Sequence, residues 1–223
     1  MKKGLTELVF ILDRSGSMSN LVSDTIGGFN SIFMQQTETG GECNVSTVLF
    51  DHQYEVLHYR IKIKEIKPIT EKEYWVRGQT ALLDAIGRTI NQAGLELSNT
   101  TEEERPEKVM FVIITDGLEN ASKEYTKEKV KEMIEHQKEK YGWEFVFLGA
   151  NIDAVDVASQ IGIAKNKVAN YVPDKAGALL KYNKVREMVS YMRESNVDKE
   201  TFDRYVAEKL GEVEEDHKKR GKK

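Results

Sequence analysis

The feature that most constrains this chain is an apolar run that ends abruptly at an acidic residue. Residues 8–12 are Leu-Val-Phe-Ile-Leu, and they lead directly into Asp13-Arg14-Ser15-Gly16-Ser17. Because both faces of the run are apolar, it predicts a fully buried strand of a parallel sheet. Asp13 then lies at the carboxyl end of that strand, where open α/β sheets bind their ligands.

Small hydroxyl residues follow this acid. Ser15 and Ser17 are two positions apart, so a looped backbone can direct both hydroxyls to one side, and Gly16 allows the bend. Oxygen-only side chains at a strand end suit a hard cation such as Mg²⁺. A turn followed by a helix N-cap explains the same residues equally well, because Asp and Ser favour both.

Strands and helices alternate along the chain. The patterns predict strands over 8–12, 44–51, 54–64, 108–115, 143–148 and 167–172, and helices over 20–37, 81–97, 122 or 126 to 141, 153–161, 175–195 and 198–215. Segment 54–64 alternates apolar and polar residues, which predicts an antiparallel edge strand, and 108–115 is apolar enough to lie centrally. We therefore expect an α/β fold with a doubly wound, mostly parallel sheet.

Three loops of such a fold should meet at one edge of the sheet. The two central strands end at Asp13 and Asp116, and Thr80 precedes the helix 81–97, for which it is an acceptable N-cap. Taken singly, Thr80 is explained as a helix N-cap and Asp116-Gly117 as a turn. Their joint placement at strand and helix ends favours convergence with the two serines.

This set of residues resembles the von Willebrand factor A domain family and its metal-ion-dependent adhesion site. The resemblance covers about 6–172, and its three motifs stand here as Asp13-Arg14-Ser15-Gly16-Ser17, as Thr80 within 78–85, and as Asp116 within 113–117. It implies a three-layer fold with sheet order 3-2-1-4-5-6, one antiparallel edge strand and helices on both faces. It also implies a site for Mg²⁺ or Mn²⁺ formed by Asp13, Ser15, Ser17, Thr80 and Asp116.

By that resemblance the chain is a non-enzymatic binding module. The hydroxyls of Ser15, Ser17 and Thr80 would contact the cation, with the two aspartates acting directly or through water. Neutral hydroxyls leave the cation electron-poor, and Mg²⁺ readily keeps exchangeable positions, so an Asp or Glu of a protein partner can bind to it. The resemblance is to stand-alone intracellular members of prokaryotes and phages, which implies an ATPase or stress-response assembly as a possible partner.

Two further acids lie close to these motifs. Glu119 follows Asp116 closely and could tune the affinity for the cation, although a solvated loop position explains it as well. Asp51 ends the strand 44–51 and could contribute to the metal site without contacting the cation directly. A role in capping the following hairpin is the simpler interpretation.

Two alternatives to the binding module stay open. In the first, Asp13 is the nucleophile of a Mg²⁺-dependent phosphotransferase or phosphatase. Haloacid-dehalogenase-like phosphatases need a second Asp two residues on, where this chain has Ser15. In the second, the chain keeps the A-domain fold and binds through another surface. Phosphate-loop, His-Glu-x-x-His and Gly-x-Ser-x-Gly motifs are missing from the sequence.

Composition narrows the functional class. The chain has 223 residues, a net charge of −4 and one cysteine, Cys43. Net negative charge argues against general nucleic-acid binding, and a single cysteine favours a reducing compartment. The sequence has no export signal and no long apolar stretch, so we predict a cytoplasmic protein that does not bind membranes. The four histidines, His52, His58, His136 and His217, are predicted to be surface residues.

The predicted organisation is an A-domain-like unit over 1–195 with its core in 6–172, followed by 196–223 as a charged helix with a basic tail. Gly27 and Gly28 interrupt the helical pattern of 20–37. They predict close packing of that helix on the sheet, because glycine is otherwise unfavourable inside a helix.

Overall fold

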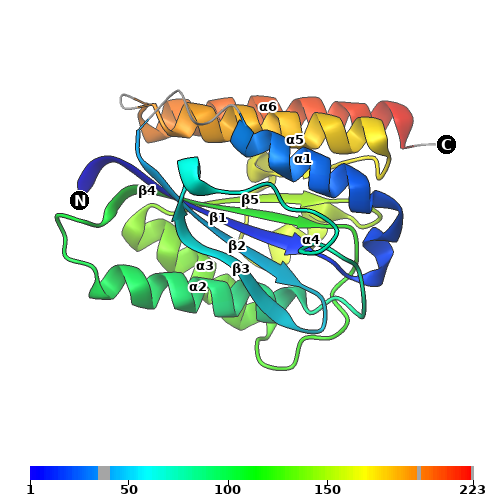
Figure 1. The fold of residues 1–223 in the computed structure, drawn as a ribbon, viewed down its shortest axis with the longest axis horizontal. Coiled ribbons are helices and arrows are strands. Elements are labelled where there is room, and N and C mark those ends of the chain that lie inside the picture. Colours follow the sequence, from blue (N-terminus) through cyan, green and yellow to red (C-terminus); the bar gives the residue numbers. More distant parts are fainter. Residues whose placement is uncertain (35–40, 195–196, 222–223) are drawn as a thin grey trace.

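The computed structural model describes residues 1–34, 41–194 and 197–221. Within these residues it contains a six-stranded sheet of order β3-β2-β1-β4-β5-β6, covered by helices on both faces (Figure 1). β2 and β3 pair in antiparallel fashion and the other neighbours pair in parallel. The predicted fold class, strand order and antiparallel edge strand are confirmed.

The strands and helices have the following bounds. The strands are β1 (Lys2–Asp13), β2 (Cys43–Phe50), β3 (Tyr54–Lys62), β4 (Pro106–Thr115), β5 (Glu144–Gly149) and β6 (Val168–Asn170). The α-helices are α1 (Val22–Met34), α2 (Leu82–Asn99), α3 (Lys127–Tyr141), α4 (Ala154–Gln160), α5 (Lys175–Met192) and α6 (Lys199–Arg220). Short 3₁₀ turns are η1 (Gly16–Leu21), η2 (Ile63–Glu65) and η3 (Lys165–Lys167).

β1 lies in the middle of the sheet because both of its faces are apolar. Leu8 pairs with Val45 on one side and with Met110 on the other. Leu8, Phe10 and Leu12 point to one face of the sheet, where α1, α5 and α6 pack. Val9 and Ile11 point to the other face, which α2, α3 and α4 cover. β1 therefore joins the two cores, and its last residue, Asp13, emerges at the carboxyl edge.

Several boundaries differ from the sequence prediction. β1 begins at Lys2 rather than at residue 8, and β6 is shorter than 167–172. The predicted end of the first helix, residue 37, lies outside the described residues. Gly28 packs on a helix and not on the sheet, because a Cβ at this position would lie 2.0 Å from a ring carbon of Tyr182 in α5. Gly27 faces open space.

The last helix is part of the main core. Phe202, Val206, Leu210 and Val213 of α6 are buried in the cluster that also holds Leu8 and Phe10 of β1. α5 and α6 lie side by side above the sheet (Figure 1). Residues 218–220 of the predicted basic tail form the last turn of α6, and residues 222–223 lie outside the described residues.

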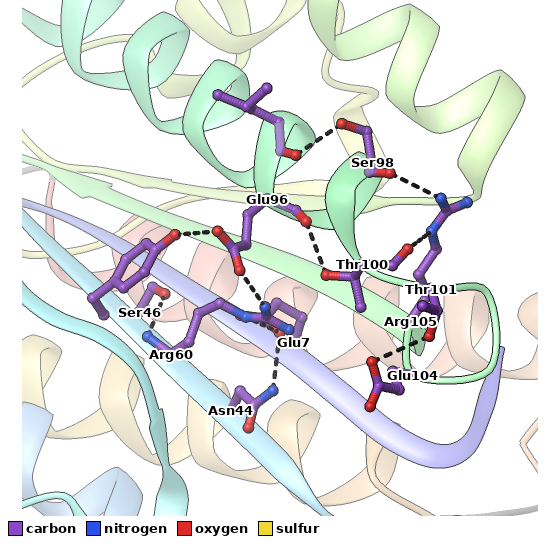
Figure 2. Close-up of polar contacts among 12 residues, drawn as sticks. Glu7, Asn44, Ser46, Arg60, Glu96, Ser98, Thr100, Thr101, Glu104 and Arg105 are labelled. Carbon is purple, nitrogen blue, oxygen red and sulfur yellow. Dashed lines mark hydrogen bonds and ion pairs between the residues drawn. The ribbon is translucent and has the colours of Figure 1, made fainter.

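A polar network ties the edge strand to α2 away from the carboxyl edge (Figure 2). The guanidinium of Arg60 in β3 donates from Nε to both carboxylate oxygens of Glu7, at 3.1 and 3.2 Å, and from Nη1 to Glu96 Oε1 at 2.9 Å. Arg60 has a φ of +49°, next to a register shift between β2 and β3. This irregular backbone lets Arg60 reach the buried Glu7.

No helix in the described ranges combines the length and the apolar character needed to cross a bilayer.

Candidate metal site

Five oxygen-bearing side chains gather at the carboxyl edge of the central strands. Asp13 is the last residue of β1, Ser15 and Ser17 lie at the start of η1, and Asp116 directly follows β4. Thr80 lies in the loop before α2. Asp13, Ser15, Thr80 and Asp116 are buried, whereas Ser17 is exposed and opens the cluster to solvent.

The three hydroxyls surround a single point beside the backbone of Gly117. A Cβ atom built on Gly117 would lie 2.9 Å from Thr80 Oγ1, 3.2 Å from Ser17 Oγ and 3.8 Å from Ser15 Oγ. The two serine hydroxyls are 3.0 Å apart. Because position 117 carries no side chain, the space between these oxygens stays open. Such an open space among oxygen ligands is what a small cation requires.

Asp116 closes the cluster from the side of β4. Ser17 Oγ donates to Asp116 Oδ1 at 2.5 Å. Asp116 Oδ2 is buried and accepts no hydrogen bond from the described residues. Burial raises the pKa of Asp116, and the hydrogen bond from Ser17 and the positive charge of Lys181 oppose the rise. A buried carboxylate oxygen without a donor is costly unless a cation or water satisfies it.

Asp13 serves a different purpose, since both of its oxygens already accept hydrogen bonds. Ser15 N donates to Oδ1 at 2.7 Å, and Thr115 Oγ1 donates to Oδ2 at 2.6 Å. Burial raises the pKa of Asp13 to about 6, against the lowering effect of these bonds. Asp13 therefore holds residues 14–17, which we call the serine loop, against β4. It also adds negative charge that a cation would offset.

These donors fit a hard divalent cation. Among the residues described, no group of three or more His, Cys, Asp or Glu is arranged to bind a metal ion. The cluster instead combines three hydroxyls with two carboxylates, an all-oxygen set that suits Mg²⁺ or Mn²⁺ better than softer metals. Ser15, Ser17, Thr80 and Asp116 could hold such an ion, with Asp13 behind them.

A second loop fastens the serine loop in place. Arg77 N donates to the Arg14 carbonyl at 2.9 Å, and Gly16 N donates to the Gly78 carbonyl at 3.2 Å. The buried Tyr74 hydroxyl donates to the Asp13 carbonyl at 2.6 Å. Residues 74–78 thus pair with residues 13–16 and set the direction of the serine hydroxyls. Sequence reasoning missed the role of Tyr74, because its partner lies 61 residues away in the chain.

The prediction that Thr80 caps α2 is wrong. The helix begins at Leu82, and its N-cap position is occupied by Ala81 without a side-chain hydrogen bond. The free amides are satisfied by the loop after β4, because Leu83 N donates to Glu119 Oε2 at 2.9 Å and Asp84 N to Ser122 Oγ at 3.0 Å. Because Thr80 does not cap α2, its hydroxyl can face the hydroxyls of Ser15 and Ser17.

Asn120 positions Thr80, and sequence reasoning missed it. Its side-chain Oδ1 accepts from Thr80 N at 2.9 Å, and its backbone N donates to the Thr80 carbonyl at 3.0 Å. These two bonds join the Thr80 loop to the loop that carries Asp116. The only signal in the sequence is a polar residue shortly after Asp116, which does not reveal a partner 40 residues away.

The two additional acids have structural roles. Glu119 accepts from the amides of Leu83, Ala121 and Ser122, so its carboxylate organises the loop. Asp51 is fully buried and accepts from Gln53 N at 2.6 Å, in keeping with a hairpin role. It also pairs with Arg14 Nε at 3.0 Å and Arg77 Nε at 2.7 Å.

Comparison with known proteins identifies the fold. No protein-family model matches the chain, and a search among curated proteins found no match. Solved structures do match. Proximal thread matrix protein 1 from the mussel byssus, solved with a zinc-occupied MIDAS motif, is 19% identical over 85% of this chain, with a TM-score of 0.56. The manganese-loaded TRAP protein of Plasmodium vivax is 17% identical over 81% of this chain, with a TM-score of 0.53.

A von Willebrand factor type A protein from Catenulispora acidiphila is 16% identical over 83% of this chain, with a TM-score of 0.53. The match covers 46% of the mussel chain, 73% of the Plasmodium chain and 42% of the Catenulispora chain, so this chain spans less than half of two of them. At these identities the similarity shows the fold alone. The chain has the fold of the von Willebrand factor A domains.

Proposed function

We propose that this protein is a metal-dependent binding module in which Ser15, Ser17, Thr80, Asp13 and Asp116 hold a divalent cation. The observation that carries the proposal is the open space beside Gly117, with three hydroxyls within 3.8 Å of one point. The buried and unsatisfied Asp116 Oδ2 supports it. Two similar structures, with zinc in a MIDAS motif and with manganese bound, support a divalent metal in this fold.

The ligand we propose is an Asp or Glu side chain of a protein partner. A bound cation supplies a Lewis acid for that carboxylate. The chain itself presents mostly neutral hydroxyls, which leave the charge of the cation incompletely balanced. It also exposes Ser17 to solvent, so that the ligand can reach the cation. Mg²⁺ is the proposed ion in the cell. The cytoplasm is the proposed compartment, because the buried Cys43 forms no disulfide. An ATPase or stress-response partner stays a prediction from the resemblance alone.

The phosphotransferase alternative finds less support. A nucleophilic carboxylate needs an oxygen that is free to attack, yet both oxygens of Asp13 accept hydrogen bonds at 2.6–2.7 Å and the residue is 1% exposed. Metal-dependent turnover of a phosphate ester that disappears in Asp13→Asn would favour the enzyme over the binding module.

Thermal unfolding of the full chain with and without metal tests the site. At a hundredfold excess of Mn²⁺ or Mg²⁺ over its Kd, binding should stabilise the fold by about 2.7 kcal/mol and raise Tm by about 5 °C or more. Asp13→Ala and Ser15→Ala should each abolish this rise.

Asp153→Ala is the matched control. Asp153 caps α4 and is not among the proposed ligands, so its loss should lower Tm while the response to metal remains. An unchanged melting curve for the native chain in saturating Mn²⁺ and Mg²⁺ would overturn the proposal.

A further inference from the structure

Trp75 is a large apolar side chain exposed beside the candidate metal site. Its exposed fraction is 43%. Immediately before it in the chain, the Tyr74 hydroxyl donates to the Asp13 carbonyl at 2.6 Å. Two residues after it, Arg77 N donates to the Arg14 carbonyl at 2.9 Å. The loop that carries Trp75 is therefore bonded to the serine loop and its preceding residue on both sides of the indole.

Two guanidinium groups hold the indole of Trp75 in place. The centre of its ring lies 4.5 Å from the guanidinium carbon of Arg77 and 5.4 Å from that of Arg14. One carboxylate oxygen of the buried Asp51 fixes both groups, at 2.7 Å from Arg77 Nε and 3.0 Å from Arg14 Nε. Because cation–π contact with two fixed cations restrains the ring, the indole has little freedom left to lose when a partner binds.

Leu118 is a second exposed apolar side chain at the site. It is 61% exposed and directly follows Gly117, beside which the three hydroxyls lie. Its neighbours in the chain are fixed, because Gly117 N donates to Thr115 Oγ1 at 3.3 Å and Asn120 N donates to the Thr80 carbonyl at 3.0 Å. The loop after β4 thus presents Leu118 to solvent in a fixed position.

The two side chains belong to loops on opposite flanks of the serine loop. Leu118 follows β4, whereas the loop of Trp75 contacts the end of β2 through the ion pair of Arg77 with Asp51. β1, which ends at Asp13, lies between β2 and β4. Single exposed apolar residues are common on protein surfaces, but two fixed ones that flank the opening of one site indicate a contact surface.

We propose that Trp75 and Leu118 are specificity-determining residues, which select a partner acid that has apolar side chains next to it. This proposal rests on the proposed function, because the partner's Asp or Glu must first reach the cation. The neighbouring side chains of the partner segment then cover the indole and Leu118. These contacts bury apolar area on both proteins, and tryptophan is among the residues that contribute most to binding.

Two capped tripeptides test the proposal on the full chain loaded with Mn²⁺. Acetyl-Leu-Asp-Leu-amide and acetyl-Ser-Asp-Ser-amide carry the same acid and differ only in its neighbours. Water-proton relaxation of the bound Mn²⁺ measures both affinities, and the leucine peptide should bind about tenfold more tightly than the serine peptide. The ratio of the two affinities is the readout, because a change at the metal site itself acts on both peptides alike.

Trp75→Ala and Leu118→Ala should each reduce this ratio to about threefold, and the double variant should reduce it to about one. Trp75→Phe should keep most of the preference, because it retains an apolar ring. Melting curves check that each variant folds.

Tyr141→Ala and Leu95→Ala are the matched controls. Their side chains are 55% and 66% exposed, so each resembles the residue for which it controls. Tyr141 ends α3 shortly before β5 begins, and Leu95 lies toward the end of α2, so both are near the amino edge of the sheet, opposite the site. The ratio should stay within about twofold of the native value.

Fluorescence quenching locates the contact independently. The other tryptophan, Trp143, is 4% exposed and stacks on Phe111 with ring centres 5.3 Å apart. Because the chain has two tryptophans, Trp143→Phe leaves Trp75 as the one indole that emits. Acrylamide quenching of this variant in Mg²⁺ should fall when the leucine peptide covers the indole, and the serine peptide should change it less.

The outcomes separate this proposal from the proposed function. Equal affinities of the native chain for the two peptides, or a full preference for leucine in both Trp75→Ala and Leu118→Ala, would overturn the role of these residues while leaving the metal site in place. Should Trp75→Ala not fold, the ratio in Leu118→Ala and the quenching of Trp75 decide the matter. Failure of the native chain to bind Mn²⁺, or of both peptides to reach the bound ion, would instead overturn the proposed function.

Discussion

At the scale of single residues, the important property of Gly117 is that it has no side chain. The three hydroxyls of the cluster lie around the point where its Cβ would be, the nearest being Thr80 Oγ1 at 2.9 Å. Real side chains do not tolerate such a contact without a shift of the neighbour. The backbone of Gly117 does not lie in the left-handed region, so the space beside it is the reason for glycine at this position.

We predict that Gly117→Ala folds but loses its response to metal. The added methyl would occupy the space between the hydroxyls and push Thr80 aside, so the rise in Tm with Mn²⁺ should fall to near zero. Thermal unfolding with Mn²⁺ and with chelator measures this difference.

Gly27→Ala is the control for that variant. Position 27 lies inside α1 and faces open space, so alanine there should raise the free energy of unfolding by about 0.5–1 kcal/mol. The metal response should be unchanged. A full metal response in Gly117→Ala would show that the cation does not bind between these hydroxyls.

At the scale of the element, β3 departs from the sequence prediction through His58. The prediction that all four histidines lie on the surface is wrong for this residue, which is 8% exposed. Its ring lies parallel to that of Phe29 in α1, and its Nδ1 is 3.0 Å from Thr47 Oγ1 in β2. The register shift between β2 and β3 on either side of the Thr47–His58 pair turns position 58 to the α1 face, where its ring packs as a core side chain.

This burial predicts a pH dependence of stability. Burial lowers the pKa of His58 below its usual value of 6.5, so the unfolded chain binds a proton before the folded chain does. The contribution of His58 is therefore complete above about pH 6.5 and is lost as the pH falls through and below that value. Urea unfolding between about pH 5.5 and 7.5 should show this loss.

In His58→Gln the loss over the same interval should be smaller, because glutamine does not titrate. His136→Gln is the control, because His136 is exposed on α3 and the variant should leave the pH dependence of the native chain in place. Equal slopes for the native chain and His58→Gln would remove His58 as a source of the pH dependence.

At the scale of the whole molecule, the helices after β6 belong to the fold that carries the site. α6 contributes Leu210 at 1% exposure to the same core as β1, and α5 contributes Val185 and Met188 to that core. The division at residue 195 stays a prediction. The packing of α6 on α5 favours describing both helices as part of one cooperative unit.

We predict that Leu210→Ala lowers the free energy of unfolding by about 2–4 kcal/mol, because it leaves a cavity in this shared core. The metal response should persist, since no ligand moves. Chemical denaturation measures the change, and one transition shared by fluorescence and circular dichroism would support a single unit.

Leu179→Ala is the matched control, because Leu179 on α5 is 58% exposed and should change stability by less than about 0.5 kcal/mol. An effect of Leu210→Ala as small as that of the control would mean that α6 contributes little to the core.

Much of this molecule follows from short stretches of sequence. The apolar run before Asp13 determined a central buried strand, and the alternation of patterns determined a doubly wound sheet. The helix caps are local as well: Thr126, Asp153, Asp174 and Asp198 each accept a hydrogen bond from an amide three residues on. These features depend on residues that are neighbours in the chain, so sequence alone specifies them.

Only the tertiary structure decided which distant groups would meet. Glu119 and Ser122 cap α2 from another loop, Asn120 fixes Thr80, and Lys181 of α5 packs on the ring of Tyr171. Each of these contacts joins segments that the crossovers of the sheet bring together, and no local propensity encodes such a pair. The sequence by itself determined the sheet and the oxygen-rich residues at its edge. The packing of the loops decided the orientation of these residues, because it depends on partners that are close only in the folded chain.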